Sequence, residues 1–250
     1  IRLISILILH PLKCFRFLRL EIRSHDDSRK AIKNLIINSH IIGKCLDWIH
    51  FCFATTSLGR ENLAWAMRVK SAVSFRGFDI GLYPHQHPGC YDLLWKKIDK
   101  VHTISDDLYQ KALGLGLDPK ISLTKITPAI NTGFFKSNTD ENYHRPLRIL
   151  TVGRLVWIKG YEYTLKALRL LKDQQINFEY HIIGEGSYRE AIVYAIHQLE
   201  LTDHVKLKGQ LSHVEVKEEM EWADIYIQPS IQEGFCNAAL EAQAMGLLCI

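Results

Sequence analysis

The sequence predicts an α/β protein made of two doubly wound domains in tandem. Three observations support this prediction: short apolar runs alternate with segments of helical apolar spacing, glycine-bearing loops follow the runs, and a polar stretch separates two halves of the chain. Strands that alternate with helices form parallel sheets through right-handed crossovers. A ligand of such a domain binds at the carboxyl ends of the strands.

The pattern is clearest after residue 146, where the strand, loop and helix unit repeats. Strands are expected at 147–152, 178–183, 205–207 and 224–228, because these runs are apolar and rich in β-branched residues. Helices are expected at 161–172, 188–199, 213–222 and 237–245, where apolar residues recur with helical spacing. The final residues, 247–250, also read as an apolar strand.

The first half shows the same alternation more weakly. Strands are expected at 48–54, 72–75 and 101–104, and helices at 61–69 and 106–113. Residues 131–146 have the composition of a linker. The sequence therefore predicts one partial domain over 1–136 and a second over 137–250. Because the chain begins with Ile and ends on an apolar run, we expect both domains to be truncated.

Composition and charge limit the classes of function. The balance of 47% hydrophobic and 23% charged residues is that of a globular protein and excludes disordered and collagen-like classes. The first 146 residues carry 21 Lys and Arg against 13 Asp and Glu, whereas the rest carry 10 against 14. The acidic second half is no platform for nucleic acid, and none is expected as a partner.

Cysteine usage and hydropathy indicate a cytoplasmic protein. The six cysteines lie far apart without a C-x-x-C pair, which is typical of reduced thiols. The apolar run at 4–9 is far shorter than the ~20 residues that span a membrane.

Two cations flank the loop after the expected strand at 147–152. Gly153 and Arg154 begin this loop, and Lys159 and Gly160 end it where the next helix starts. A helix start adds backbone N–H donors and the positive end of a dipole, so a phosphate or diphosphate suits this turn.

Two carboxylates follow the strand at 224–228. Glu233 and Gly234 lie in the loop, whereas Glu241 lies one turn into the helix, with seven residues between the two carboxylates. Carboxylates accept hydrogen bonds from vicinal hydroxyls of a sugar or ribose. Gly234 permits close backbone approach, and the helix start again favours phosphate.

These motifs together resemble the donor site of the family 4 retaining glycosyltransferases of GT-B fold, the group 1 glycosyltransferases. The resemblance implies two Rossmann-like domains that face each other across a cleft. It covers residues 46–250, and its most specific part is the pair of glutamates in this strand-to-helix context. The motifs are Gly153-Arg154-Leu155, Lys159-Gly160, Gly184-Glu185-Gly186, Glu233-Gly234-Phe235, Glu241-Ala242, Pro128-Ala129-Ile130-Asn131 and Thr103-Ile104-Ser105.

The resemblance also implies roles for individual residues. Arg154 and Lys159 would hold the donor diphosphate and stabilise the leaving nucleotide. Glu241 would accept hydrogen bonds from the ribose and Glu233 from the transferred sugar. The backbone of Phe235, Cys236 and Asn237 would line sugar and phosphate, and Leu211 would border the base. On the acceptor side, Arg76 and Asp79 occupy the place where many members carry a histidine-containing segment.

The expected activity is metal-independent transfer of a hexose-type sugar from a nucleoside diphosphate sugar to a saccharide or lipid-linked acceptor, with retention, in glycan or polysaccharide biosynthesis. No cofactor is expected. No Asp-x-Asp element occurs, and His85 with His87 lacks a third ligand, so no metal site is predicted. Two alternatives stay open: a nucleotide-sugar 2-epimerase of similar fold, and a non-catalytic remnant that binds nucleotide or a partner.

Residues 12–23 are expected to form a basic amphipathic helix. Arg16, Arg19 and Arg23 fall on one stripe, beside an arc of Cys14, Phe15, Leu18 and Ile22. Two interpretations stay open: an ordinary surface helix, or peripheral contact with an anionic membrane on its cytoplasmic face. His50, in an apolar run, is expected to be a hydrogen-bonded core residue.

Overall fold

The computed structural model describes residues 2–136 and 145–250, which divide into two compact units. Unit 1 comprises Ile1–Thr127 and unit 2 comprises Pro128–Ile250. The division lies ahead of the expected boundary at 136 and 137, because the side chain of Phe135 is buried in the core of unit 2. The segment 128–136, which precedes the strands of unit 2, therefore belongs to that unit.

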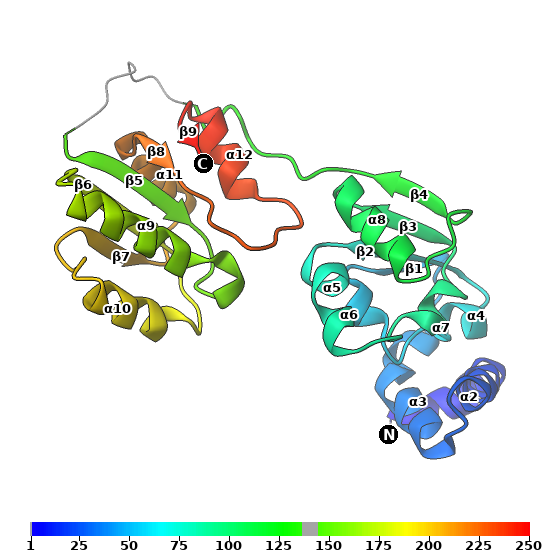
Figure 1. The fold of residues 1–250 in the computed structure, drawn as a ribbon. Coiled ribbons are helices and arrows are strands. Elements are labelled where there is room, and N and C mark those ends of the chain that lie inside the picture. The colour runs from blue at the N-terminus through cyan, green and yellow to red at the C-terminus, as the bar shows by residue number, and fades with distance from the viewer. Residues whose placement is uncertain (1, 137–144) are drawn as a thin grey trace. The chain divides into compact units, whose positions relative to one another are not determined.

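Unit 1 contains a four-stranded parallel sheet in the order β1-β2-β3-β4 (Figure 1). Each strand pairs with the next one along the chain, so each new strand is added on the same side of the preceding one. The strands are β1 Trp48–Phe51, β2 Lys70–Phe75, β3 Lys100–Thr103 and β4 Ser122–Lys125. The first three lie where the sequence predicts strands.

The helices of unit 1 form two groups. Helices α1, α2 and α3, which are blue in Figure 1, pack against one another. Helices α2 and α3 also contact α4. The shorter helices α5 to α8 and the 3₁₀ turn η1 follow the strands. The elements are α1 Arg2–Leu9, α2 Pro11–His25, α3 Ser28–Ile42, η1 Ala54–Ser57, α4 Leu63–Met67, α5 Phe78–Gly81, α6 Tyr83–Gln86, α7 Asp92–Trp95 and α8 Asp106–Gly114.

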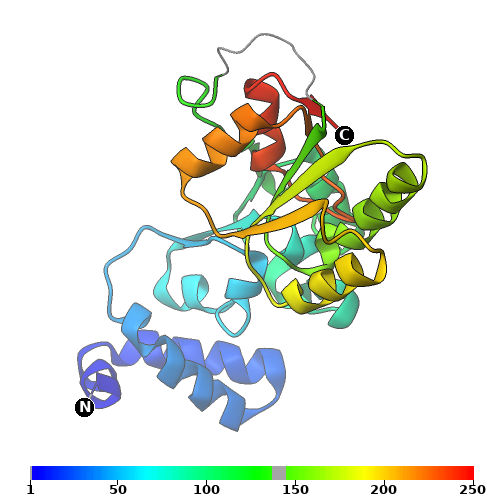
Figure 2. The same ribbon diagram turned by 90° about the vertical axis from the view of Figure 1, so that its left-hand side faces the viewer.

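Unit 2 contains a five-stranded parallel sheet in the order β7-β6-β5-β8-β9 (Figure 2). The chain moves outward from β5 through β6 to β7 and then returns to the other side of β5, so the order reverses between β5 and β8. Such a reversal is the switch point where ligands bind in doubly wound domains. The strands are β5 Leu147–Val152, β6 Phe178–Ile183, β7 Val205–Gly209, β8 Ile225–Tyr226 and β9 Leu248–Cys249.

Helices cover both faces of this sheet. Ile149 of β5 packs into one hydrophobic cluster with α9 and α10, whereas the adjacent Leu150 packs into the other cluster with α11 and α12. Figure 2 shows the two pairs of helices on opposite sides of the strands. The elements are η2 Trp157–Lys159, α9 Tyr161–Asp173, α10 Arg189–Gln198, α11 His213–Trp222 and α12 Asn237–Ala244. All four α-helices and the five strands lie where the sequence predicts them, within a few residues.

The expected amphipathic helix forms α2, and its apolar arc is divided between the core and the surface. Cys14 is buried beside Phe17, whereas Phe15 and Ile22 are exposed. The buried face follows from contacts with α3 and α4, which the sequence of α2 alone does not specify. No helix within the described residues is long and apolar enough to cross a membrane.

Candidate functional site

Three loops of unit 2 interlock at the carboxyl edge of its sheet. They follow β5, β6 and β8, and glycine permits each close approach. A Cβ atom on Gly160 would lie 2.0 Å from the Pro229 carbonyl oxygen, and one on Gly184 would lie 2.0 Å from that of Gly153. The amide of Ile231 donates to the Ile158 carbonyl at 2.9 Å. The predicted motif segments are therefore neighbours in space on both sides of the switch point.

Tyr161, the first residue of α9, fixes the loop after β5. Its buried hydroxyl donates to the Gly153 carbonyl at 2.9 Å, and the Arg154 carbonyl lies 3.3 Å away. Burial is the main cause that raises the pKa of this phenol far above its usual value. Tyr161 therefore remains a neutral donor that holds the turn on which Arg154 is carried.

Lys159 and Glu233 form an ion pair across the switch point. Lys159 ends the loop after β5, whereas Glu233 lies in the loop after β8, and both side chains are largely buried. The same carboxylate oxygen, Oε1, accepts from the Ser230 hydroxyl at 2.7 Å and from Gln228 Nε2 at 3.1 Å. Arg154 is exposed, and within the part of the chain that the structure describes no ion pair holds it. The structure thus brings together one paired and one unpaired cation.

The helix α12 carries the second predicted carboxylate. Glu241 is half-buried, and burial raises its pKa above the usual value, while the charge of His213 at the start of α11 partly offsets this effect. Cys236 is the N-cap residue of α12 without a side-chain capping bond, and Asn237 is the first helical residue. Gly234 and Phe235 lie just before them, and Leu211 packs against the same core cluster as Ala242. The predicted donor-site residues therefore gather around β8 and α12.

In unit 1, Asp79 is fully buried and holds the loop after β2. Its carboxylate accepts from the amides of Arg76 at 3.0 Å, Gly77 at 2.9 Å and Ala54 at 2.9 Å. These bonds occupy both carboxylate oxygens, so they indicate that Asp79 orders the loop. Arg76 is exposed at the carboxyl end of β2.

A row of polar side chains crosses the sheet of unit 1 beside Arg76, and the sequence did not reveal it. His50 Nε2 lies 2.7 Å from the Ser74 hydroxyl, which lies 2.9 Å from His102 Nδ1. The expectation of a core histidine was wrong: His50 is exposed, because β1 alternates and only Ile49 and Phe51 face the core. Desolvation lowers the pKa of His50, and the charges of His102 and Arg76 lower it further. The three side chains come from the adjacent parallel strands β1, β2 and β3. Knowledge of how these strands pair would have been needed to predict the row from the sequence.

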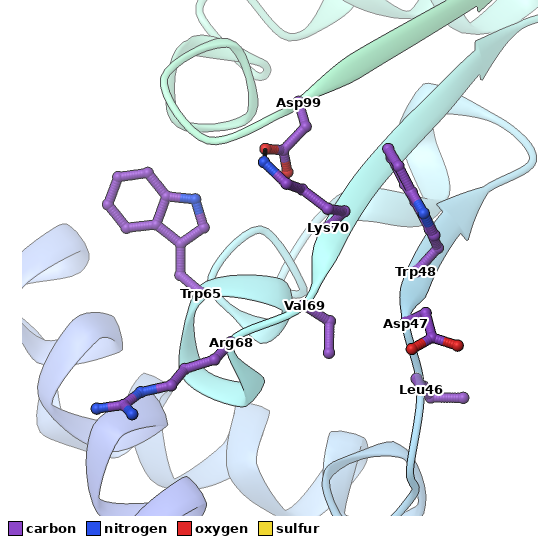
Figure 3. Close-up of a pocket in the computed structure, with 8 residues that line it drawn as sticks. All are labelled: Leu46, Asp47, Trp48, Trp65, Arg68, Val69, Lys70 and Asp99. Atoms are coloured by element: carbon purple, nitrogen blue, oxygen red, sulfur yellow. Dashed lines mark hydrogen bonds and ion pairs between the residues drawn. The ribbon is translucent and has the colours of Figure 1, made fainter.

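A cavity of about 530 Å³ lies at the opposite, amino-terminal edge of the same sheet (Figure 3). Trp48 and Lys70 begin β1 and β2 there, and Asp99, just before β3, pairs with Lys70 at 2.9 Å. Trp65 lies across the cavity from Trp48. Because ligands of doubly wound domains bind at the carboxyl ends of strands, this cavity is not the predicted donor or acceptor site.

The described residues contain no group of three or more His, Cys, Asp or Glu side chains that could hold a metal ion. His87, one of the two histidines in the pair His85 and His87, stacks on Tyr83 with ring centres 4.2 Å apart.

The second half of the chain matches the model of a known protein family. Residues 135–250 match the family described as glycosyl transferases group 1. The match covers the predicted donor-site residues of unit 2.

Curated relatives match most of the chain. It is 32% identical over 208 residues to the amylovoran biosynthesis glycosyltransferase AmsK of Erwinia amylovora, which covers 80% of this chain and 51% of that protein. It is 28% identical over 207 residues to the putative colanic acid biosynthesis glycosyltransferase WcaL of Escherichia coli, which covers 79% of this chain and 50% of that protein. The chain spans about half the length of the curated relatives it matches.

Solved structures show the fold. The Anabaena protein Alr3699/HepE, solved with UDP-glucose, superimposes with a TM-score of 0.69 at 15% identity over 88% of this chain and 62% of that one. Sucrose-phosphate synthase of Thermosynechococcus elongatus gives a TM-score of 0.67 at 16% identity, over 90% and 61%. The two Rossmann-like units have the GT-B fold class, as the sequence predicted.

Proposed function

We propose that this chain is part of a group 1 glycosyltransferase that transfers a hexose-type sugar from a nucleoside diphosphate sugar to a saccharide or lipid-linked acceptor with retention. One observation carries the proposal: Lys159, in the loop that also holds Arg154, pairs with Glu233 across the switch point, and Glu241 lies on the helix that follows the loop of Glu233. Cations suit the diphosphate and carboxylates suit the hydroxyls of the same donor.

In the proposed reaction, an acceptor hydroxyl attacks the anomeric carbon while the bond from that carbon to the diphosphate oxygen breaks. The leaving phosphate oxygen takes the hydroxyl proton, and transfer occurs on the face that the diphosphate leaves. Arg154 and Lys159 stabilise the negative charge that develops on the diphosphate, which is where preorganised cations contribute most. Lys159 exchanges its bond with Glu233 for the phosphate.

The remaining residues orient the donor. Glu241 accepts from the ribose hydroxyls and Glu233 from the sugar, while the backbone at Phe235, Cys236 and Asn237 lines sugar and phosphate. Leu211 borders the base. Solved neighbours in complex with UDP or UDP-glucose support a uridine diphosphate donor. Relatives named for amylovoran and colanic acid biosynthesis support a polysaccharide product.

The acceptor is proposed to meet the loop after β2, where Asp79 holds the backbone and presents Arg76. Catalysis is proposed to be independent of metal, because two protein cations stabilise the leaving group.

A cytoplasmic location, with peripheral contact to the inner face of a membrane, is proposed from the basic and apolar surface of α2.

A panel of nucleotide sugars tests the proposal on the full-length protein. We expect one uridine diphosphate sugar to raise the melting temperature and to be consumed faster when acceptor is present, with no loss of rate in EDTA. Restoration of a chelated enzyme by Mn²⁺ or Mg²⁺ would overturn metal independence. Release of an isomeric nucleotide or free sugar without acceptor would mark a 2-epimerase, and binding without turnover would mark a non-catalytic protein.

A further inference from the structure

The carboxylate of Glu233 is held on one side only. Its Oε1 atom accepts hydrogen bonds from Lys159, Ser230 and Gln228. Within residues 2–136 and 145–250, its second oxygen, Oε2, accepts no hydrogen bond. One oxygen is therefore fully engaged by the protein, and the other is available to a ligand.

The Gln228 side chain is itself fixed in one orientation. The Tyr226 hydroxyl donates to Gln228 Oε1 at 2.6 Å, so the Nε2 group must face the other way, toward Glu233 and Ser230. Tyr226 is fully buried in β8, and burial raises the pKa of its phenol well above the usual range. A phenol that stays neutral keeps a proton to donate, and a flipped amide would place its oxygen against the negative Oε1 of Glu233, so the orientation with Nε2 toward Glu233 is favoured.

We propose that Gln228 and Ser230 are positioning residues that hold Glu233 with Oε2 turned toward a hydroxyl of the donor sugar. This inference rests on the proposed function. When the diphosphate takes the ammonium group of Lys159, the carboxylate loses one of its three donors. The two neutral donors from the loop after β8 then keep Oε1 in place.

The arrangement also makes the site selective for the hydroxyl that meets Oε2. A buried group that is built to bond a substrate hydroxyl discriminates strongly against an analogue that lacks it. A carboxylate that swings freely between orientations discriminates less. Loss of Gln228 or Ser230 should therefore weaken sugar discrimination, whereas UDP alone, which has no sugar, should bind as before.

The experiment compares Gln228→Leu, Ser230→Ala and their double variant with wild type in the full-length protein. Each single change removes a hydrogen bond to a charged group, and we expect kcat/KM for the nucleotide sugar to fall by about tenfold. Preference for the sugar over its deoxy analogues should fall with it, and the Kd for UDP should stay unchanged. Ser230→Thr retains the hydroxyl and should restore most of the rate.

Gln232→Leu is the matched control. It removes the same kind of side chain from the same loop, and among the described residues no hydrogen bond joins Gln232 to Glu233. Its rate and sugar preference should equal those of wild type.

Two results would overturn the inference: wild-type rates in both Ser230→Ala and Gln228→Leu, or an equal loss of UDP affinity and of turnover, which would mean that the loop merely collapses. If Gln228→Leu does not fold, Ser230→Ala against Ser230→Thr decides alone. Failure of the proposed function is a separate result, because the unmodified protein would then turn over no nucleotide sugar.

Discussion

A single carboxylate oxygen connects two loops that are 74 residues apart in the chain, since Lys159 and Glu233 meet at Oε1. Motif resemblance identified both residues, but a sequence motif contains no information about which side chains contact each other. The contact changes the interpretation of Lys159. A lysine already paired with a carboxylate must exchange partners when a phosphate arrives, whereas Arg154, which forms no ion pair with the described residues, needs no exchange.

Alanine variants at Arg154 and at Lys159 test the proposed role of these cations in the full-length protein. Each change removes a cation from the leaving group, and we expect kcat to fall by about a hundredfold. Sugar discrimination should stay intact in both variants, because Gln228 and Ser230 hold Glu233 once the diphosphate has taken the ammonium group of Lys159. Lys166→Ala, an exposed lysine on α9, is the control and should keep wild-type turnover. Wild-type turnover in the Arg154 and Lys159 double variant would contradict the assignment of the loop.

We expect Glu241 to give the proposed donor affinity a pH dependence. Burial raises the pKa of this carboxyl, so it protonates earlier than an ordinary glutamate as pH falls, and a protonated carboxyl no longer accepts from both ribose hydroxyls. We expect the affinity for UDP-sugar to fall as the pH is lowered, starting at a higher pH than an ordinary glutamate with a pKa of about 4.3 would give.

Unfolding does not explain the loss of UDP-sugar affinity at low pH, because the pKa of Glu241 is raised and not lowered in the folded protein. A raised pKa means that the folded state binds the proton more tightly, so the contribution of Glu241 to stability grows as pH falls and is lost as pH rises through its folded pKa. Isothermal titration of wild type and Glu241→Gln measures the effect. The amide variant should bind more weakly with little pH dependence, and an equal decline in both proteins would contradict the role of Glu241.

At the scale of elements, the second half was predictable and the first half was less so. Strands β5 and β6 of unit 2 are largely buried on both faces, so they read as nearly continuous apolar runs. In contrast, β4 was missed because its residues are mostly exposed and polar. Helix α3 was also missed, because exposed Ile32, Ile36 and Ile37 blur its helical pattern.

The interlocked loops make Gly184 a sensitive position. Its φ of 138° is rarely accessible to other residues, and a Cβ would lie 2.0 Å from the Gly153 carbonyl oxygen. We expect Gly184→Ala to lower the free energy of unfolding by about 1–3 kcal/mol, because both strain and overlap must be relieved. Urea denaturation measures the change.

Gly114→Ala is a suitable comparison, since this helical glycine has no neighbouring atom within 4 Å of a built Cβ. It should be neutral or slightly stabilising. Equal stability of the two variants would show that the loops rearrange at little cost.

At the scale of the whole molecule, the two units carry separate cores and opposite charge. The sequence predicted two domains from composition and periodicity, but it placed the boundary inside unit 2. Polar residues after Pro128 resemble a linker, and only packing shows that Phe135 anchors this segment in the second core.

The basic first half leads to a prediction about membranes. Leu12, Phe15 and Ile22 are exposed on α2 together with Arg19 and Arg23. Attraction to anionic lipid contributes about 1 kcal/mol for each basic residue near the surface. Full-length protein should sediment with anionic vesicles, less so with neutral ones, and be released by salt. An Arg19→Glu and Arg23→Glu variant should sediment less, and equal recovery in the supernatant with both vesicle types would leave α2 an ordinary surface helix.

The strand order of unit 2 also determines when its site is assembled during synthesis. Strand β5 can pair with β6 soon after both leave the ribosome, but its other neighbour, β8, is made much later. Contacts between distant segments form slowly because a long loop must close first. Strands β5 and β6 with helix α9 are therefore made while Lys159 still lacks Glu233, and we expect the proposed nucleotide site to be completed only after β8 has been made.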